Sequence, residues 1–130
     1  IEKYVAIHTN AHAYTSLGQL RYLSCLRHVD GVVGNSSSGL IEAPSFGVGT
    51  INIGDRQRGR LRAKSVIDCD PDRQSIAAAL QQLYSPGFQK MLKTVSNPYG
   101  DGGASEKIIR RVYDYPLESI LKKSFYDLVQ

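Results

Sequence analysis

The chain has 130 residues and a formal net charge of +4, with 42% hydrophobic and 22% charged residues. This composition indicates one globular domain with its own core, and no apolar run approaches the roughly 18 residues of a membrane span, so we expect no membrane partner. The chain begins without methionine or a signal-peptide pattern, which predicts a piece of a longer, cytoplasmic protein.

Cysteine and histidine are few. Cys25 and Cys69 lie in apolar contexts on different predicted elements, which favours reduced, buried thiols over a disulfide or a metal site. The three histidines lack companion cysteines at the spacing of zinc ligands, so we expect neither a metal nor a cofactor.

Much of the positive charge lies in one stretch between two predicted strands. No aromatic residue interleaves these cations and no nucleic-acid motif contains them, so we expect no nucleic-acid partner. We interpret the stretch as a flexible basic loop beside an anionic ligand, with a solvated loop that only aids solubility as the alternative. Its cations are Arg56, Arg58, Arg60, Arg62 and Lys64.

Short apolar strands and amphipathic helices alternate along the chain. Leucines at positions 17, 20, 23 and 26 predict the apolar face of a helix over residues 16–28, with Ser16 as its cap. The continuous apolar run at 30–34 predicts a strand covered on both faces, as in a parallel sheet. A helix over 38–46 is expected to bend at Pro44 and to end at Gly47.

The order of the elements predicts an α/β fold, a Rossmann-like parallel sheet with helices on both faces. The other predicted elements are a helix end or strand at 4–7, strands at 11–14, 50–53 and 65–69, helices that begin near Asp72 and Ser85, helices at 104–115 and 117–129, and a turn-rich loop at 97–103.

A turn of small hydroxyl residues follows the second predicted strand. Backbone N–H groups at a helix start are unpaired and the helix dipole adds positive charge, so Ser36 and Ser37 predict a seat for a phosphate or diphosphate. Glu42 follows about one helical turn after Gly39, where its carboxylate can accept from ribose hydroxyls. Arg56 follows the next strand, and parallel strands end at one edge of a sheet, so the two loops are expected to face one crevice.

Each of these residues also has an ordinary structural interpretation. Ser36 and Ser37 are typical of a polar turn that caps a helix, and Glu42 is typical of an acid that complements the dipole in a first helical turn. Arg56 is also compatible with a plain surface position, although its place at a strand end favours the crevice.

Two motifs lie at 34–47 and 50–60. The first reads Gly-Asn-Ser-Ser-Ser-Gly-Leu-Ile-Glu-Ala-Pro-Ser-Phe-Gly, and the second reads Thr-Ile-Asn-Ile-Gly-Asp-Arg-Gln-Arg-Gly-Arg. Both closely resemble the UDP-N-acetylglucosamine 2-epimerase family, and the second resembles its hydrolysing branch, which serves sialic acid synthesis and the polysialic acid capsule. The resemblance runs from about residue 16 to residue 112, with Gly49 where the family often has proline.

The resemblance implies a fold and a place in a larger protein. Family members have two Rossmann-like domains that face each other across a cleft, the glycosyltransferase-B arrangement. Residues 1–130 would be the C-terminal UDP-binding domain, and the N-terminal catalytic domain would be absent. The full-length protein would be a homodimer.

The resemblance also assigns ligand contacts. Ser36 and Ser37 would hold the diphosphate of UDP-N-acetylglucosamine or UDP, and Arg56 would lie near its phosphates. Glu42 would take the ribose hydroxyls, and Leu17 would lie opposite the uracil. No catalytic residue is implied within this chain.

Three functions follow from these expectations. The first is the UDP-binding half of a hydrolysing epimerase that converts UDP-N-acetylglucosamine and water to N-acetylmannosamine and UDP, with the isolated fragment inactive. The second is a glycosyltransferase of the same architecture. The third is a sugar-nucleotide-binding module without turnover.

Overall fold

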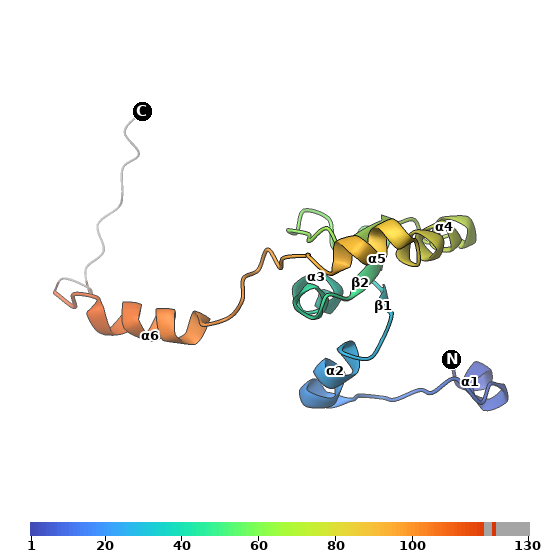
Figure 1. Ribbon diagram of the computed structural model, residues 1–130. Helices are drawn as coiled ribbons and strands as arrows, with labels where there is room; N and C mark the ends of the chain where they lie inside the picture. Colours follow the sequence, from blue (N-terminus) through green and yellow to red (C-terminus); the bar gives the residue numbers. More distant parts are fainter. Residues whose placement is uncertain (119–120, 122–130) are drawn as a thin grey trace. The chain divides into compact units, whose positions relative to one another are not determined.

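The computed structural model describes residues 1–118 and 121, and the chain divides into two compact units, Ile1–Gly100 and Asp101–Gln130 (Figure 1). The described part contains no helix long and apolar enough to cross a bilayer. The second unit contains α6 (Ala104–Asp114). The first unit contains α1 (Glu2–Ile7), α2 (Gly18–Leu26), β1 (Gly31–Gly34), α3 (Ser38–Ile41), the 3₁₀ turn η1 (Ala43–Phe46), β2 (Gly49–Ile53), β3 (Val66–Cys69), α4 (Arg73–Leu83) and α5 (Pro86–Leu92).

The three strands form a parallel sheet in the order β1-β2-β3, which confirms the predicted Rossmann-like α/β fold. Gly31 pairs with Gly49, and Thr50 pairs with Val66. The α3–η1 segment connects β1 to β2, whereas an irregular loop over residues 54–65 connects β2 to β3. Because the strands are parallel, both connections leave from the same edge of the sheet.

The core lies between the sheet and α4. Ile51 and Ile67 pack from the sheet against Ala79 and Leu83 of the helix, and all four side chains are buried. Full burial of each of the three larger side chains, Ile51, Ile67 and Leu83, contributes about 1.5–3 kcal/mol to folding. The sheet and α4 therefore form a rigid base for the loops at the strand ends.

Gly49 lets this layer approach β2 closely. A Cβ at this position would collide with Leu83 and would lie 2.9 Å from Cε1 of Phe88. The proline that the resembled family often carries here would not fit the present packing without movement of α4 or α5. The departure at Gly49 is thus explained by the side chains that pack over it.

The opposite face of the sheet lies against α3 and the 54–65 loop. Thr50 Oγ1 donates a hydrogen bond to the Gly39 carbonyl at 2.8 Å, and both residues are buried. Asn52 on the same face donates to Asp68 at 2.7 Å. Coverage of β1 is partial, because Val33 is 52% exposed, so the prediction of a fully covered strand is wrong at this edge.

The strand predicted at residues 11–14 is wrong, because no strand in the described part of the chain pairs with these residues. Residues 2–7 are helical, which agrees with one of the two alternatives expected at 4–7. The helix predicted at 16–28 begins later, at Gly18, and Leu17 occupies the cap position instead of Ser16. Ser16 Oγ accepts a local hydrogen bond from the Gly18 amide at 3.1 Å.

The leucines of α2 do not share one face. Leu26 is 2% exposed, whereas Leu20 is 81% exposed. A step of three residues rotates a helix by about 300°, so four leucines at this spacing drift around the axis. Cys25 is exposed, which corrects the expectation of a buried thiol, and Cys69 is half-buried.

The helix predicted over 38–46 is divided into two short turns. Pro44 lies in the first turn of η1, and Gly47 ends it with a positive φ of 67°. Proline removes a helical hydrogen bond, so the expected interruption is confirmed. The helix predicted at 117–129 lies outside the described residues, apart from positions 117, 118 and 121, none of which is helical.

Candidate functional site

The turn between β1 and α3 offers free hydrogen-bond donors. In residues 1–118 and 121, the backbone amides of Ser36 and Ser37 have no acceptor, and the Ser38 amide reaches only Ser36 Oγ at 3.4 Å. Because α3 is one turn long, its dipole is much weaker than that of a full helix. The free amides and hydroxyls, more than the dipole, therefore make this turn suitable for an anion.

The loop after β2 contacts this turn. Arg56 Nη1 lies 3.4 Å from both the carbonyl and the side-chain oxygen of Asn35, and Gln57 Nε2 donates to the same carbonyl at 2.7 Å. Gln57 is buried, so this contact anchors the loop to the end of β1. The two strand-end loops are thus brought together, as the parallel topology predicts.

A second group of residues lines an open hollow of about 540 Å³ beside α2. Tyr22 of α2 lines it, and its hydroxyl forms a 2.5 Å hydrogen bond with Ser38 Oγ, at the start of α3. The hollow is therefore joined to the serine turn by one side chain. Its lining consists of Ser16, Leu17, Gly18, Gln19, Tyr22 and Glu42.

Glu42 lies at the C-terminal end of α3, not in its first turn. An acid at that end has no favourable interaction with the dipole of the helix, so the alternative of a dipole-complementing acid is not supported. Its half-buried side chain faces the hollow that Leu17 also lines. The predicted residues thus form two groups, one with Ser36, Ser37 and Arg56 and the other with Leu17 and Glu42.

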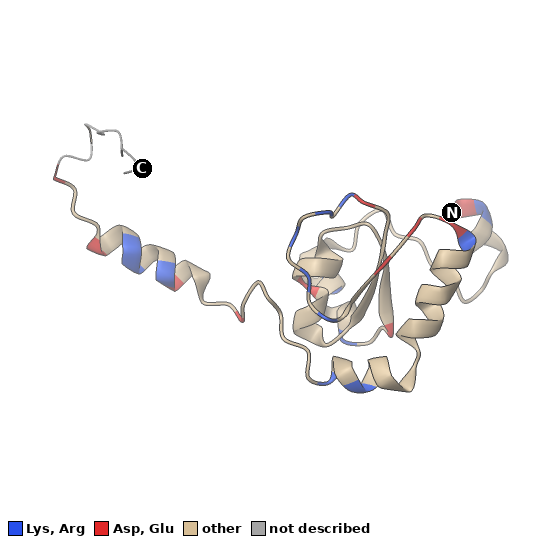
Figure 2. Ribbon diagram, turned by 90° about the horizontal axis from the view of Figure 1, so that it is seen from above, with Lys and Arg blue, Asp and Glu red and all other residues tan. Residues whose placement is uncertain are grey.

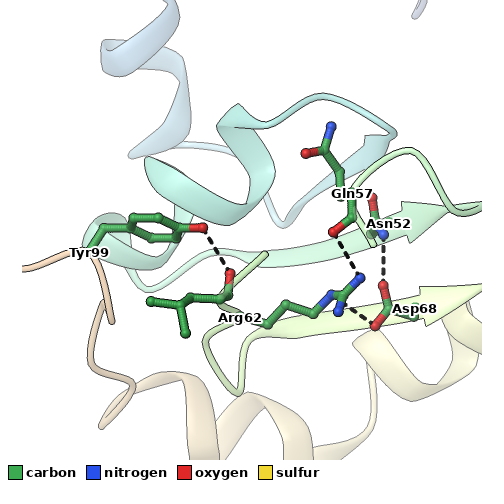
Figure 3. A network of polar contacts seen from close by, with 6 residues as sticks. Asn52, Gln57, Arg62, Asp68 and Tyr99 are labelled. Carbon is green, nitrogen blue, oxygen red and sulfur yellow. Dashed lines mark hydrogen bonds and ion pairs between the residues drawn. The ribbon is translucent and has the colours of Figure 1, made fainter. Parts of the chain in front are cut away.

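The basic loop, whose Lys and Arg positions are blue in Figure 2, is anchored at several points, in contrast to the flexible loop expected from the sequence. Figure 3 shows some of these contacts. Arg62 forms an ion pair with Asp68 at 3.2 Å and donates to the Gln57 carbonyl at 3.2 Å. The Tyr99 hydroxyl donates to the carbonyl of Leu61 at 3.1 Å. These contacts hold the loop against the sheet and the 97–100 segment.

A second hollow, of about 660 Å³, lies at the ends of β2 and β3. Its lining mixes charges of both signs, with Arg58 and Arg62 beside Asp55 and Asp68. The described residues contain no group of three metal-ligating side chains. Burial first, and the nearby aspartates second, raise the pKa of the Cys69 thiol, which lowers its reactivity.

Comparison with known proteins decides the family. Residues 1–112 match the family model described as UDP-N-acetylglucosamine 2-epimerase. The chain belongs to this family. The resemblance carried by the two motifs is thereby confirmed, and the match includes both groups of candidate residues.

Three relatives that the chain matches are longer than the chain itself. Polysialic acid biosynthesis protein P7 of Escherichia coli is 41% identical over 109 residues, 82% of this chain and 28% of that protein. A GDP/UDP-N,N'-diacetylbacillosamine 2-epimerase (hydrolyzing) of Campylobacter jejuni is 40% identical over 119 residues, 91% of this chain and 30% of that protein. A UDP-N,N'-diacetylbacillosamine 2-epimerase (hydrolyzing) of Legionella pneumophila is 36% identical over 124 residues, 95% of this chain and 32% of that protein. The chain therefore spans less than a third of the length of these epimerase relatives.

The sequence alone did not indicate several residues that the structure places at the candidate site. Tyr22 lies within the helix that the sequence predicts over residues 16–28, and nothing in its neighbours indicates the contact with Ser38. Gln57 lies inside the second motif, directly after Arg56, so its position was a usable signal. The sequence does not distinguish Arg62 from the other cations of the loop.

Proposed function

We propose that this chain is the UDP-binding, C-terminal domain of a hydrolysing UDP-sugar 2-epimerase with the glycosyltransferase-B arrangement. One observation supports it above all. The turn with two unpaired amides beside Arg56 is joined, through Tyr22 and Ser38, to the hollow that holds Glu42 and Leu17. A nucleotide diphosphate needs such adjacent seats, one for its phosphates and one for its nucleoside.

The roles follow from the chemistry of each group. The amides and hydroxyls of Ser36 and Ser37 bind the diphosphate, and Arg56 neutralises part of its charge. Glu42 accepts hydrogen bonds from the ribose hydroxyls, and Leu17 packs against the uracil. Hydrogen bonds to an ionised group contribute about 1.5–3 kcal/mol each, so Glu42 is worth roughly 10- to 100-fold in affinity.

The reaction in the whole protein would use this domain to hold the leaving group. A base outside this chain takes the proton from C2 of the sugar, and UDP leaves from C1 with the electrons of the C1–O bond. Water then adds to the resulting 2-acetamidoglucal and gives N-acetylmannosamine. Negative charge grows on the leaving diphosphate, and donors already fixed around it stabilise that charge without reorganising.

Titration of the chain with UDP tests the binding proposal. Glu42→Ala is expected to weaken binding roughly tenfold or more, because one charge-assisted hydrogen bond to the ribose is lost. Replacing Ser37 by leucine should block docking of the diphosphate. Glu106→Ala is the matched control, since it removes an exposed carboxylate from the other unit. Equal affinities for all three variants and the unaltered chain would reject the assignment.

Product analysis by NMR on the full-length protein tests the reaction. Free N-acetylmannosamine from UDP-N-acetylglucosamine supports a place in sialic acid or polysialic acid synthesis. We propose separately that the whole protein acts as a cytoplasmic homodimer. A second candidate substrate is UDP-N,N'-diacetylbacillosamine, because two relatives carry that name. A requirement for an acceptor sugar would instead indicate a glycosyltransferase, and binding without reaction would indicate a module without turnover.

A further inference from the structure

A series of polar contacts runs from the middle of the sheet to the residue before the serine turn, and Figure 3 shows its part from Asn52 to Gln57. Asn52 of β2 donates to Asp68 of β3 at 2.7 Å, and the other Asp68 oxygen pairs with Arg62 Nε at 3.2 Å. Arg62 Nη2 donates to the Gln57 carbonyl at 3.2 Å. Gln57 Nε2 then donates to the Asn35 carbonyl at 2.7 Å, directly before the serine turn.

The two amide side chains in this series are buried. Asn52 is 1% and Gln57 is 2% exposed, and the amide oxygen of each lacks a partner in the part of the chain that the structure describes. An unpaired buried oxygen costs about 1–3 kcal/mol, so these side chains are not optimised for stability alone. Each is oriented by the hydrogen bond that its nitrogen donates.

We propose that the Arg62–Asp68 pair positions the diphosphate seat. Arg62 holds the backbone of Gln57, Gln57 holds Asn35, and Arg56 precedes Gln57 in the chain. Arg62 is thus a positioning residue that acts through its neighbours. The inference rests on the proposed function, because it needs the serine turn to bind the diphosphate.

A purely electrostatic role and a positioning role predict opposite effects of Asp68→Asn on the affinity for UDP. If Arg62 and Asp68 acted only through their long-range fields, loss of the carboxylate would tighten the binding of an anionic ligand. If they act by positioning, Asp68→Asn and Arg62→Ala both weaken it. Arg60→Ala is the matched control, because it removes the same charge from the same loop, and the Arg60 side chain has no hydrogen bond or ion pair within residues 1–118 and 121.

The experiment compares UDP with uridine by NMR titration of the ¹⁵N-labelled chain and its variants, well below their melting temperatures. Asp68→Asn and Arg62→Ala are expected to weaken UDP binding about five- to tenfold, the loss of one ordinary hydrogen bond, and to leave uridine binding within about twofold. Arg60→Ala should change UDP affinity less than about twofold. Because Asp68→Asn is isosteric, it remains informative even if Arg62→Ala fails to fold.

Results that contradict the positioning role can be distinguished from results that contradict the proposed function. Unchanged or tighter UDP binding by Asp68→Asn would overturn the positioning role while the proposed function stands. An equal loss for UDP and uridine would also overturn it, since a general distortion of the fold would then explain both. Failure of the unaltered chain to bind UDP would overturn the proposed function and this inference together.

Discussion

Gly39→Ala tests the close approach of α3 to the sheet. A Cβ on Gly39 would lie 2.5 Å from Thr50 Cγ2 and 3.3 Å from Thr50 Oγ1. Carbon atoms pack best at about 3.5–4.0 Å, so α3 would have to move outward by about 1 Å. Thr50 cannot easily yield, because it lies on the central strand and its hydroxyl bonds to the Gly39 carbonyl.

Two contributions of opposite sign determine how Gly39→Ala changes the free energy of unfolding. Alanine is better than glycine in a helix by up to about 1 kcal/mol. Overpacking of a buried site costs about 1–3 kcal/mol, and α3 is too short to use the full gain in propensity. We therefore expect a net loss of about 1–2 kcal/mol, which lowers the Tm of a unit of about 100 residues by about 4–16 °C.

Thr50→Ser supplies the rescue. It removes the methyl that collides with the new Cβ and keeps the hydroxyl that bonds to the Gly39 carbonyl. Urea unfolding should show the double variant to be more stable than Gly39→Ala alone, with a coupling of about 1 kcal/mol or more in a double-mutant cycle. A double variant no more stable than Gly39→Ala would refute the collision as the cause.

Two further predictions concern ionisable groups. Asp72 caps α4, and hydrogen bonds from the Ser75 hydroxyl at 2.6 Å and from the amides of Ser75 and Gln74, both at 2.9 Å, lower the pKa of its carboxyl. Because the pKa of Asp72 is lower in the folded than in the unfolded chain, the stabilisation is present above about pH 4 and is lost as the pH falls through the folded pKa. In urea unfolding, the free energy of unfolding of Asp72→Asn should therefore fall less on acidification than that of the unaltered chain. Iodoacetamide at about pH 8 should alkylate the exposed Cys25 before Cys69, because the raised pKa of Cys69 leaves less of its thiolate. Peptide mapping that finds Cys69 modified first would contradict this prediction.

The sheet could be predicted because its signals are local. The strands at 31–34, 49–53 and 66–69 are short segments rich in valine and isoleucine, and each lies within one residue of the predicted bounds. The meeting of the two strand-end loops then follows from parallel topology, without knowledge of any side chain. The Asp72 cap is equally local, since a capping carboxylate reaches only two or three residues along the chain.

The rest depends on contacts between distant residues. No strand within residues 1–118 and 121 pairs with residues 11–14, and local composition does not reveal this. Tyr22 and Ser38 are 16 residues apart, and Gln57 and Asn35 are 22 apart. Any of the loop cations could have paired with Asp68, and only the folded path of the loop selects Arg62.

Because α3 is short, the positive potential at the serine turn depends on the basic loop. A long helix would supply a dipole of about half a charge at its N-terminus, but Pro44 and the turn of η1 stop α3 after four residues. The positive field at the serine turn must then come largely from Arg56, on a different connection. Arg56 can keep a fixed distance from the serine turn only if its loop is held in place. Gln57 holds the loop to the end of β1, and Arg62 holds the backbone of Gln57. Loss of either anchor should therefore weaken diphosphate binding even though every direct contact residue is still present.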